Sequence, residues 1–174
     1  MTKRSRFRSS TTLLYALALI GVSAPVEAIS EEEWVTTFVR FVDWPTAPPD
    51  NLIVVCQPPG AALLALHGAQ VRGMTLQVVP LKRASDAERC HVFTAMSQRE
   101  AEWLPLLGKF KSRPTLTLGA GPRFCEAGGA ICVVKDESTG VEKYQVNLDA
   151  MARAGLKVRL QLLRHQRSGK AHAE

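Results

Sequence analysis

The stretch Leu52-Ile53-Val54-Val55-Cys56 is a continuous apolar run, and it ends at Gln57-Pro58-Pro59-Gly60. A short run without alternating polar residues is typical of a strand that is buried on both faces. Strands of this kind occur in parallel sheets whose faces are covered by helices. The stretch therefore indicates an α/β domain, and the segments that flank it agree with this interpretation.

Further strands are predicted downstream, over residues 74–79, 90–95, 115–118, 130–134 and 141–146. The last two are joined by Asp136-Glu137-Ser138-Thr139-Gly140, which predicts an antiparallel hairpin. Strands that alternate with short helices favour an α/β sheet with this hairpin at one edge. The chain contains no internal repeat and no long linker, so a single domain is expected.

Helices are predicted for segments that carry a start or stop signal. The first helix covers residues 31–43 and is capped by Ser30, with Glu33 completing a capping box. The second covers residues 61–67 and ends at Gly68, and the third covers residues 98–107 between Ser97 and Gly108. The last runs from Leu148 to Leu163 and is capped by Asn147. Gly155 is expected to kink or split the last of these helices.

The N-terminal residues 1–28 have the features of a secretory signal peptide. Four basic residues precede a ten-residue apolar run from Leu13 to Val22, which is shorter than the ~20 residues that span a bilayer. Cleavage is expected after Ala28, and a buried N-terminal helix is the alternative interpretation. The first cysteine is Cys56, so no cysteine lies at the cleavage site to take a lipid, and no adjacent arginine pair precedes the apolar run. A soluble, unanchored product is therefore expected. Residues 29–165 then form the α/β domain, and residues 166–174 are expected to be a polar, disordered tail.

The charge of the chain is concentrated at its two ends. The formal net charge is +6, but without residues 1–28 the chain has 18 Lys and Arg against 15 Asp and Glu, and residues 29–149 have 12 against 14. A nucleic-acid partner is therefore not expected, because it needs a concentrated basic patch on the folded body. With 46% hydrophobic and 22% charged residues, the chain is neither a disordered, a collagen-like nor a multi-span membrane protein.

Four cysteines, Cys56, Cys90, Cys125 and Cys132, lie in the part of the chain that is expected to be exported. Disulfides are therefore expected, and three pairings are possible. The pairing that is local in the sequence joins Cys125 to Cys132 and leaves Cys56 for Cys90. If the strands that carry Cys56 and Cys90 are parallel neighbours in plain register, the two sulfur atoms begin at opposite strand ends. The second bridge then requires one strand to be shifted along the other. A zinc site is the competing interpretation, although no Cys-x-x-Cys pair is present.

The chain resembles the YfiR-like family of periplasmic proteins over about residues 30–165. The segment from Phe38 to Pro45 resembles the family's opening helix, which ends in an aromatic-x-x-Trp-Pro pattern. The matching C-terminal features are Gly128-Gly129 before a hairpin, Val146-Asn147-Leu148-Asp149, Ala154-Gly155-Leu156-Lys157-Val158 and Leu162-Leu163-Arg164. The four cysteines match two disulfides of the family in position and spacing, which implies the pairs Cys56–Cys90 and Cys125–Cys132.

The resemblance implies a signalling function. It implies a single Rossmann-like sandwich, here of about six mostly parallel strands with the C-terminal antiparallel hairpin, flanked by four or five helices. It also implies a periplasmic protein that represses an inner-membrane diguanylate cyclase by binding the periplasmic domain of that enzyme. Cyclic di-GMP and biofilm formation would then stay low. The family further implies sequestration by an outer-membrane lipoprotein and a tendency to form homodimers.

Three residues are candidates for contact with a partner. Trp44 precedes Pro45 at a helix end, where it either covers the core or stands exposed as an anchor. Arg159-Leu160-Gln161 replaces the Ser-Ser-Lys that is usual in the family, which makes Arg159 and Gln161 candidates as well.

No catalytic, cofactor or metal site is predicted. Gly119-Ala120-Gly121 lacks the third glycine of a dinucleotide fingerprint and favours a tight turn, and the four histidines are scattered. The alternative function is a carrier or sensor of a small ligand, which would bind at the strand ends near residues 57–60 and 119–122.

Overall fold

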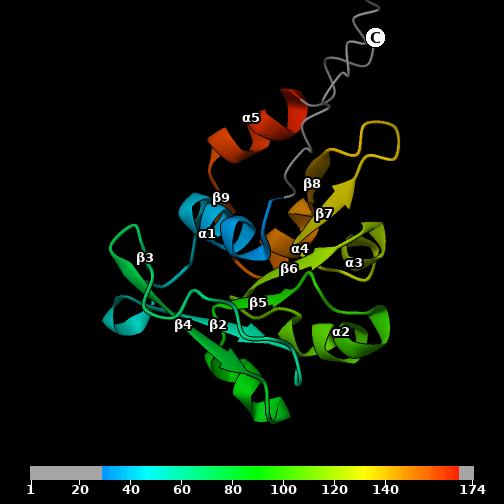
Figure 1. Ribbon diagram of the computed structural model, residues 1–174. Coiled ribbons are helices and arrows are strands. Elements are labelled where there is room, and N and C mark those ends of the chain that lie inside the picture. The colour runs from blue at the N-terminus through cyan, green and yellow to red at the C-terminus, as the bar shows by residue number, and fades with distance from the viewer. Residues whose placement is uncertain (1–28, 169–174) are drawn as a thin grey trace, which may run out of the picture.

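The computed structural model describes residues 29–168 as one mixed α/β domain (Figure 1). Its α-helices are α1 (Glu31–Phe41), α2 (Glu100–Leu107), α3 (Pro122–Glu126), α4 (Leu148–Arg153) and α5 (Leu160–Ser168), and its 3₁₀ helices are η1 (Pro49–Asn51), η2 (Ala84–Arg89) and η3 (Gly108–Phe110). Its strands are β1 (Val42–Asp43), β2 (Leu52–Gln57), β3 (Gln70–Val71), β4 (Met74–Pro80), β5 (Val92–Ala95), β6 (Leu116–Ala120), β7 (Ile131–Lys135), β8 (Glu142–Val146) and β9 (Lys157–Val158).

The main sheet has the order β3-β4-β2-β5-β6-β7-β8. Strands β4, β2, β5, β6 and β7 are parallel, while β3 and β8 are antiparallel to their neighbours at the two edges. Counted along the chain, the parallel strands follow the doubly wound order 2-1-3-4-5. This confirms the predicted Rossmann-like α/β class and the antiparallel hairpin, β7–β8, at one edge.

Each face of the sheet has its own hydrophobic core. On one face, side chains of α1, α4 and α5 pack against the sheet, with Phe38, Ile53 and Leu162 among the buried residues. On the other face, η2, α2, η3 and α3 pack around Phe93 and Phe124. The β2 run explains this arrangement, because Ile53 and Val55 belong to the first core while Val54 and Cys56 belong to the second.

Helix α1 has the capping box that the sequence predicts. The Ser30 hydroxyl accepts the backbone N–H of Glu33, and the Glu33 carboxylate accepts the backbone N–H of Ser30. The helix ends at Phe41, and the chain continues into β1 before it reaches Trp44-Pro45.

A second, two-stranded sheet joins the beginning of the domain to its end. Strand β1 pairs antiparallel with β9, with Val42 opposite Val158 and Asp43 opposite Lys157. The predicted last helix is split at Gly155, whose φ of 67° suits glycine, and β9 lies between the two parts. Asn147 caps the first part, as predicted, because its side chain accepts the backbone N–H of Ala150 at 3.0 Å.

Two local predictions were wrong. Residues 61–67 form turns and not a helix, because the side chain of buried Gln57 donates to the Ala62 carbonyl and accepts the Leu64 N–H. Ser97 does not cap α2, which begins after Arg99; the Ser97 hydroxyl donates to the Glu31 carboxylate instead. Helix α5 also extends to Ser168, into the predicted tail.

No helix within residues 29–168 is long and apolar enough to cross a membrane. The predicted signal peptide, residues 1–28, and residues 169–174 of the predicted tail lie outside the described residues.

Candidate functional site

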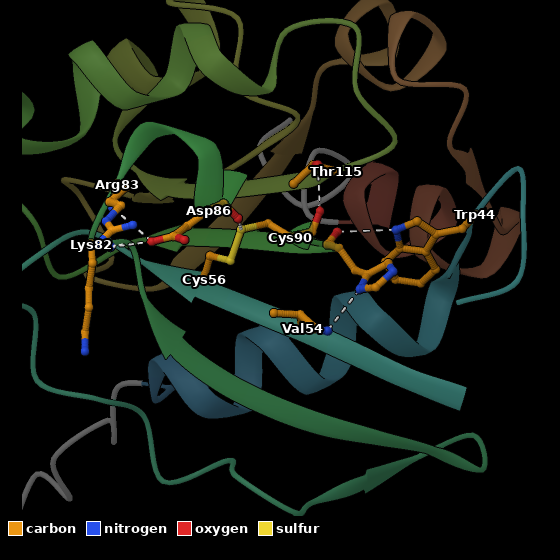
Figure 2. Close-up of a disulfide and its surroundings, with 9 residues drawn as sticks. Trp44, Val54, Cys56, Lys82, Arg83, Asp86, Cys90 and Thr115 are labelled. Atoms are coloured by element: carbon orange, nitrogen blue, oxygen red, sulfur yellow. Dashed lines mark hydrogen bonds between the residues drawn. A yellow bond between two sulfur atoms is a disulfide. The ribbon is translucent and has the colours of Figure 1, made fainter. Parts of the chain in front are cut away.

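The bridge between Cys56 and Cys90 lies under η2 (Figure 2). Strands β2 and β5 are parallel, with Cys56 opposite Phe93, so a Cys90 in extended register would lie far from Cys56. The chain bends at His91, however, and Cys90 belongs to the end of η2 and not to β5. The two Cα atoms are therefore only 5.8 Å apart, which provides the required stagger.

The bridge between Cys125 and Cys132 joins α3 to β7, with Cα atoms 5.7 Å apart. It closes a short loop that contains Gly128 and Gly129. The Asn147 side chain donates to the Cys125 carbonyl at 3.1 Å, and the Asn147 backbone N–H donates to the Ala130 carbonyl at 2.8 Å. The same asparagine that caps α4 thus holds the disulfide loop against that helix.

Trp44 covers the core on the α1 face of the sheet. It is half-buried, packs against the core of α1, and donates its indole N–H to the His91 carbonyl at 3.3 Å (Figure 2). The His91 imidazole in turn accepts the backbone N–H of Val54 through Nδ1 at 3.0 Å. Burial lowers the pKa of His91, which favours the neutral ring that this hydrogen bond requires.

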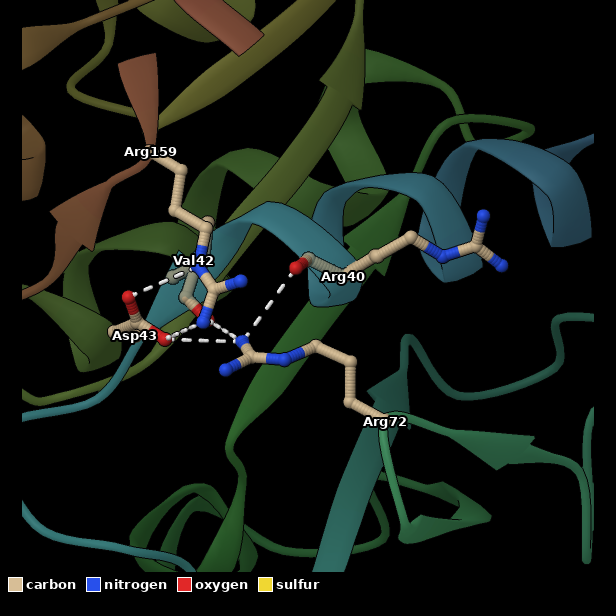
Figure 3. A network of polar contacts seen from close by, with 5 residues as sticks. All are labelled: Arg40, Val42, Asp43, Arg72 and Arg159. Atoms are coloured by element: carbon tan, nitrogen blue, oxygen red, sulfur yellow. Dashed lines mark hydrogen bonds and ion pairs between the residues drawn. The ribbon is translucent and has the colours of Figure 1, made fainter. Parts of the chain in front are cut away.

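Arg159 and Arg72 converge on the carboxylate of Asp43 (Figure 3). Arg159 donates through Nε to Oδ2 at 3.2 Å and through Nη2 to Oδ1 at 3.1 Å. Arg72 donates to Oδ1 at 2.9 Å and also to the carbonyl of Val42. The hydrogen bond from Arg159 is the main reason that the pKa of Asp43 lies below its ordinary value. We call these three residues the Asp43 cluster.

The three candidate residues therefore have different surroundings. Trp44 and Arg159 are held by contacts inside the domain, whereas Gln161 is exposed on α5. Leu160, which precedes Gln161, is 67% exposed and is the most exposed large apolar side chain within residues 29–168. Sequence reasoning missed Asp43 and Arg72, because the contact of Asp43 with Arg159 depends on the pairing of β1 with β9, and its contact with Arg72 depends on the position of the β3–β4 loop.

The crevice at the carboxyl ends of β2 and β5 is the switch point of the doubly wound sheet. A cavity of about 280 Å³ lies there, lined by residues that include Glu31, Gln57 and Ser97. The Glu31 carboxylate accepts hydrogen bonds from the hydroxyls of Thr94 and Ser97 and from the backbone N–H of Met96. The Glu31 carboxylate thus already accepts the hydrogen bonds that these three donors at the end of β5 could offer to a ligand.

The glycines at 119–121 serve packing and a turn. A Cβ at Gly119 would lie 2.2 Å from the Phe124 ring, and one at Gly129 would meet the same ring from its other edge at 2.2 Å. Gly121 has a φ of 78° and donates its N–H to the Val133 carbonyl. The predicted tight turn therefore accounts for this segment.

Within residues 29–168, no group of three or more His, Cys, Asp and Glu side chains is placed to hold a metal ion. All four cysteines are in disulfides.

A comparison with known protein families matches residues 30–165 to the family described as YfiR/HmsC-like. The match spans nearly the whole described domain, from the N-cap of α1 into α5. A search of curated proteins found no match.

Proposed function

The chain belongs to the YfiR/HmsC-like family, and on this premise we propose that it is a periplasmic binding protein that represses an inner-membrane diguanylate cyclase. The family acts in the regulation of diguanylate cyclases and is regulatory rather than catalytic. The single observation that carries the proposal is the family match over residues 30–165. The partner is the periplasmic domain of the cyclase, and the consequence of binding is a lower level of cyclic di-GMP.

The compartment is supported by the chemistry of the cysteines. The family is periplasmic, and two disulfides persist in an oxidising compartment. The apolar run within residues 1–28 provides the export signal for this location.

The surface of α5 that carries Leu160 and Gln161 supports partner binding. Leu160 exposes an apolar side chain beside the polar Gln161, a combination that suits the centre and rim of a protein interface. The start of this helix is fixed, because the Asp43 cluster and the backbone bond from Arg159 N–H to the Phe41 carbonyl anchor it to α1 and β1. A rigid element of this kind lowers the cost of ordering the backbone on binding.

The carrier or sensor function receives less support. The Glu31 carboxylate fills the hydrogen-bonding groups at the end of β5, and the Gln57 amide is satisfied by the backbone of residues 62 and 64. The crevice expected from the sequence therefore offers few free groups to a ligand.

Deletion of the gene tests the proposal. We expect cyclic di-GMP and biofilm formation to rise in the deletion strain and to return to the original level when the wild-type gene is restored. Unchanged cyclic di-GMP under conditions in which the protein is expressed would contradict the proposal.

Complementation with Leu160→Glu tests the α5 surface. We expect this variant to be exported and folded but to leave cyclic di-GMP high, because a charge at the centre of an interface opposes its desolvation. Leu63→Glu is the matched control, since Leu63 is also exposed, at 55%, but lies in the segment after β2 that lines the switch-point crevice. If Leu160→Glu lowers cyclic di-GMP as well as Leu63→Glu does, the interface does not include this surface of α5.

A further inference from the structure

A cavity lies at the amino-terminal ends of β6 and β7, and it is separate from the switch-point crevice. Its volume is about 390 Å³, within the range of small-molecule sites. Four segments form its walls: the end of α2 with η3 and residues 111–112, the start of β6, the loop between α3 and β7, and α4. Residues from both helical layers thus meet at these strand ends.

Small side chains make room for the cavity. Ala127, Gly128, Ala130, Ala150 and Ala154 line it, and buried Leu107 and Phe110 contribute apolar surface. A ligand that enters the cavity therefore meets apolar surface from these residues beside polar groups that include Ser112 and Thr115.

The second disulfide fixes one wall of the cavity. Residues 126–130 lie inside the loop that Cys125 and Cys132 close. Ala130 N–H donates to the Thr117 hydroxyl at 2.8 Å, which attaches this wall to β6. The two hydrogen bonds of Asn147 attach it to α4. The walls are therefore held in position without a ligand, as in a preformed site.

Two cations at the cavity have no counterion. Lys111 and Arg153 line it, are exposed, and form no ion pair within residues 29–168. The single acidic residue of the lining, Glu126, is paired with Arg123 at 3.3 Å. Low-dielectric walls focus the field of such charges, so the cavity attracts anions.

We propose that this cavity binds a small organic anion, with Lys111 and Arg153 at its carboxylate or sulfonate group and the alanine-rich floor against its apolar body. The proposal goes beyond the regulatory function and does not depend on it. The ligand needs both an anionic group and an apolar body. The two cations alone would bind any anion, and the apolar floor alone would bind any apolar molecule.

The probe for this site is 8-anilinonaphthalene-1-sulfonate, an apolar sulfonate whose fluorescence rises on binding. We expect saturable binding of one probe per protein molecule. Benzoate should displace the probe, whereas benzyl alcohol, which has the ring without the charge, should not. Equal displacement by both compounds would overturn the proposal.

Two sets of variants locate the site. Lys111→Gln with Arg153→Gln should weaken probe binding at least tenfold. Lys109→Gln with Lys157→Gln, which removes the same charge from exposed positions outside the lining, should leave it unchanged. Ala127→Leu should reduce binding by filling the exposed part of the cavity, without a change in melting temperature. Wild-type affinity in the first double variant, or an equal loss in the control pair, would contradict the assignment.

Discussion

The guanidinium of Arg159 donates two hydrogen bonds to the carboxylate of Asp43, at 3.1 and 3.2 Å, across 116 residues of sequence. Arg72 adds a third contact from the loop between β3 and β4, at 2.9 Å. The end of α1, the edge of the main sheet and the start of α5 therefore meet at one carboxylate. The charge of this carboxylate therefore links three parts of the domain.

Asp43→Asn should lower the free energy of unfolding at pH 7 by about 1 kcal/mol, a modest value because all three side chains are partly exposed to solvent. The folded-state pKa of Asp43 is lowered, so its contribution is present above the unfolded value of 3.8 and is lost as the pH falls through the folded value. Urea unfolding at pH 7 and at pH 3 should therefore show a smaller pH effect in the variant. Asp50→Asn is the control, and an identical pH effect in both variants would contradict the role of the cluster.

His91 should make the protein less stable in mild acid. Its folded-state pKa is lowered by burial, so the unfolded chain binds a proton first, near the ordinary value of 6.5. Stability should fall as the pH drops below 6.5, and this loss should stop below the folded-state pKa. In His91→Asn, an amide oxygen replaces Nδ1 as the acceptor for Val54, and the loss between pH 7 and 5 should shrink. The control is His67→Asn at an exposed position, and it should show the same loss of stability between pH 7 and 5 as the wild type.

Removal of either disulfide should lower the melting temperature. Loop-closure entropy gives roughly 2.5 kcal/mol for the Cys125–Cys132 loop and roughly 4 kcal/mol for the longer Cys56–Cys90 loop. Cys132→Ser and Cys125→Ser should also weaken repression of the partner, and Cys56→Ser should do at least as much harm.

Mass spectrometry of non-reduced, alkylated periplasmic protein establishes the starting state for the disulfide experiment. Four alkylated thiols would contradict the bridges. If both bridges are present but a reductant leaves thermal stability and repression unchanged, their functional role is wrong.

Gly119→Ala and Gly129→Ala should each destabilise the domain by about 1–3 kcal/mol, the usual cost of overpacking. In both variants the new Cβ would overlap the ring of Phe124, which is fully buried. Gly108→Ala is the matched control, since a Cβ there meets no atom within 4 Å. Differential scanning calorimetry should separate the two classes, and equal melting temperatures would show that the ring can be displaced.

Local sequence signals predicted the elements that local interactions build. The capping box of Ser30 and Glu33, the Asn147 cap and the apolar run of β2 each act over a few residues, so their signals are visible in the sequence. The failures arose where a distant side chain competes with the local pattern. The Gln57 amide takes up backbone groups of residues 62 and 64, and Glu31 accepts the Ser97 hydroxyl.

The candidate surfaces were less predictable than the fold. Arg159 was identified by its departure from a family pattern, but its partner Asp43 lies on β1, whose two residues carry no strand signal. Lys111 and Arg153 are distant in the sequence and meet only because η3 and α4 reach the same end of β6 and β7. Such sites depend on the order of the strands in the sheet, which composition and periodicity do not specify.

The pairing of β1 with β9 also determines when the domain can be completed. Val42 leaves the ribosome long before Val158, its partner in the small sheet, because synthesis runs from the N-terminus. Until residues 157–159 emerge, β1 has no strand to pair with, and the Asp43 carboxylate lacks its hydrogen bonds from Arg159. The small sheet can therefore form only in the last part of synthesis, after nearly all of the described domain has left the ribosome.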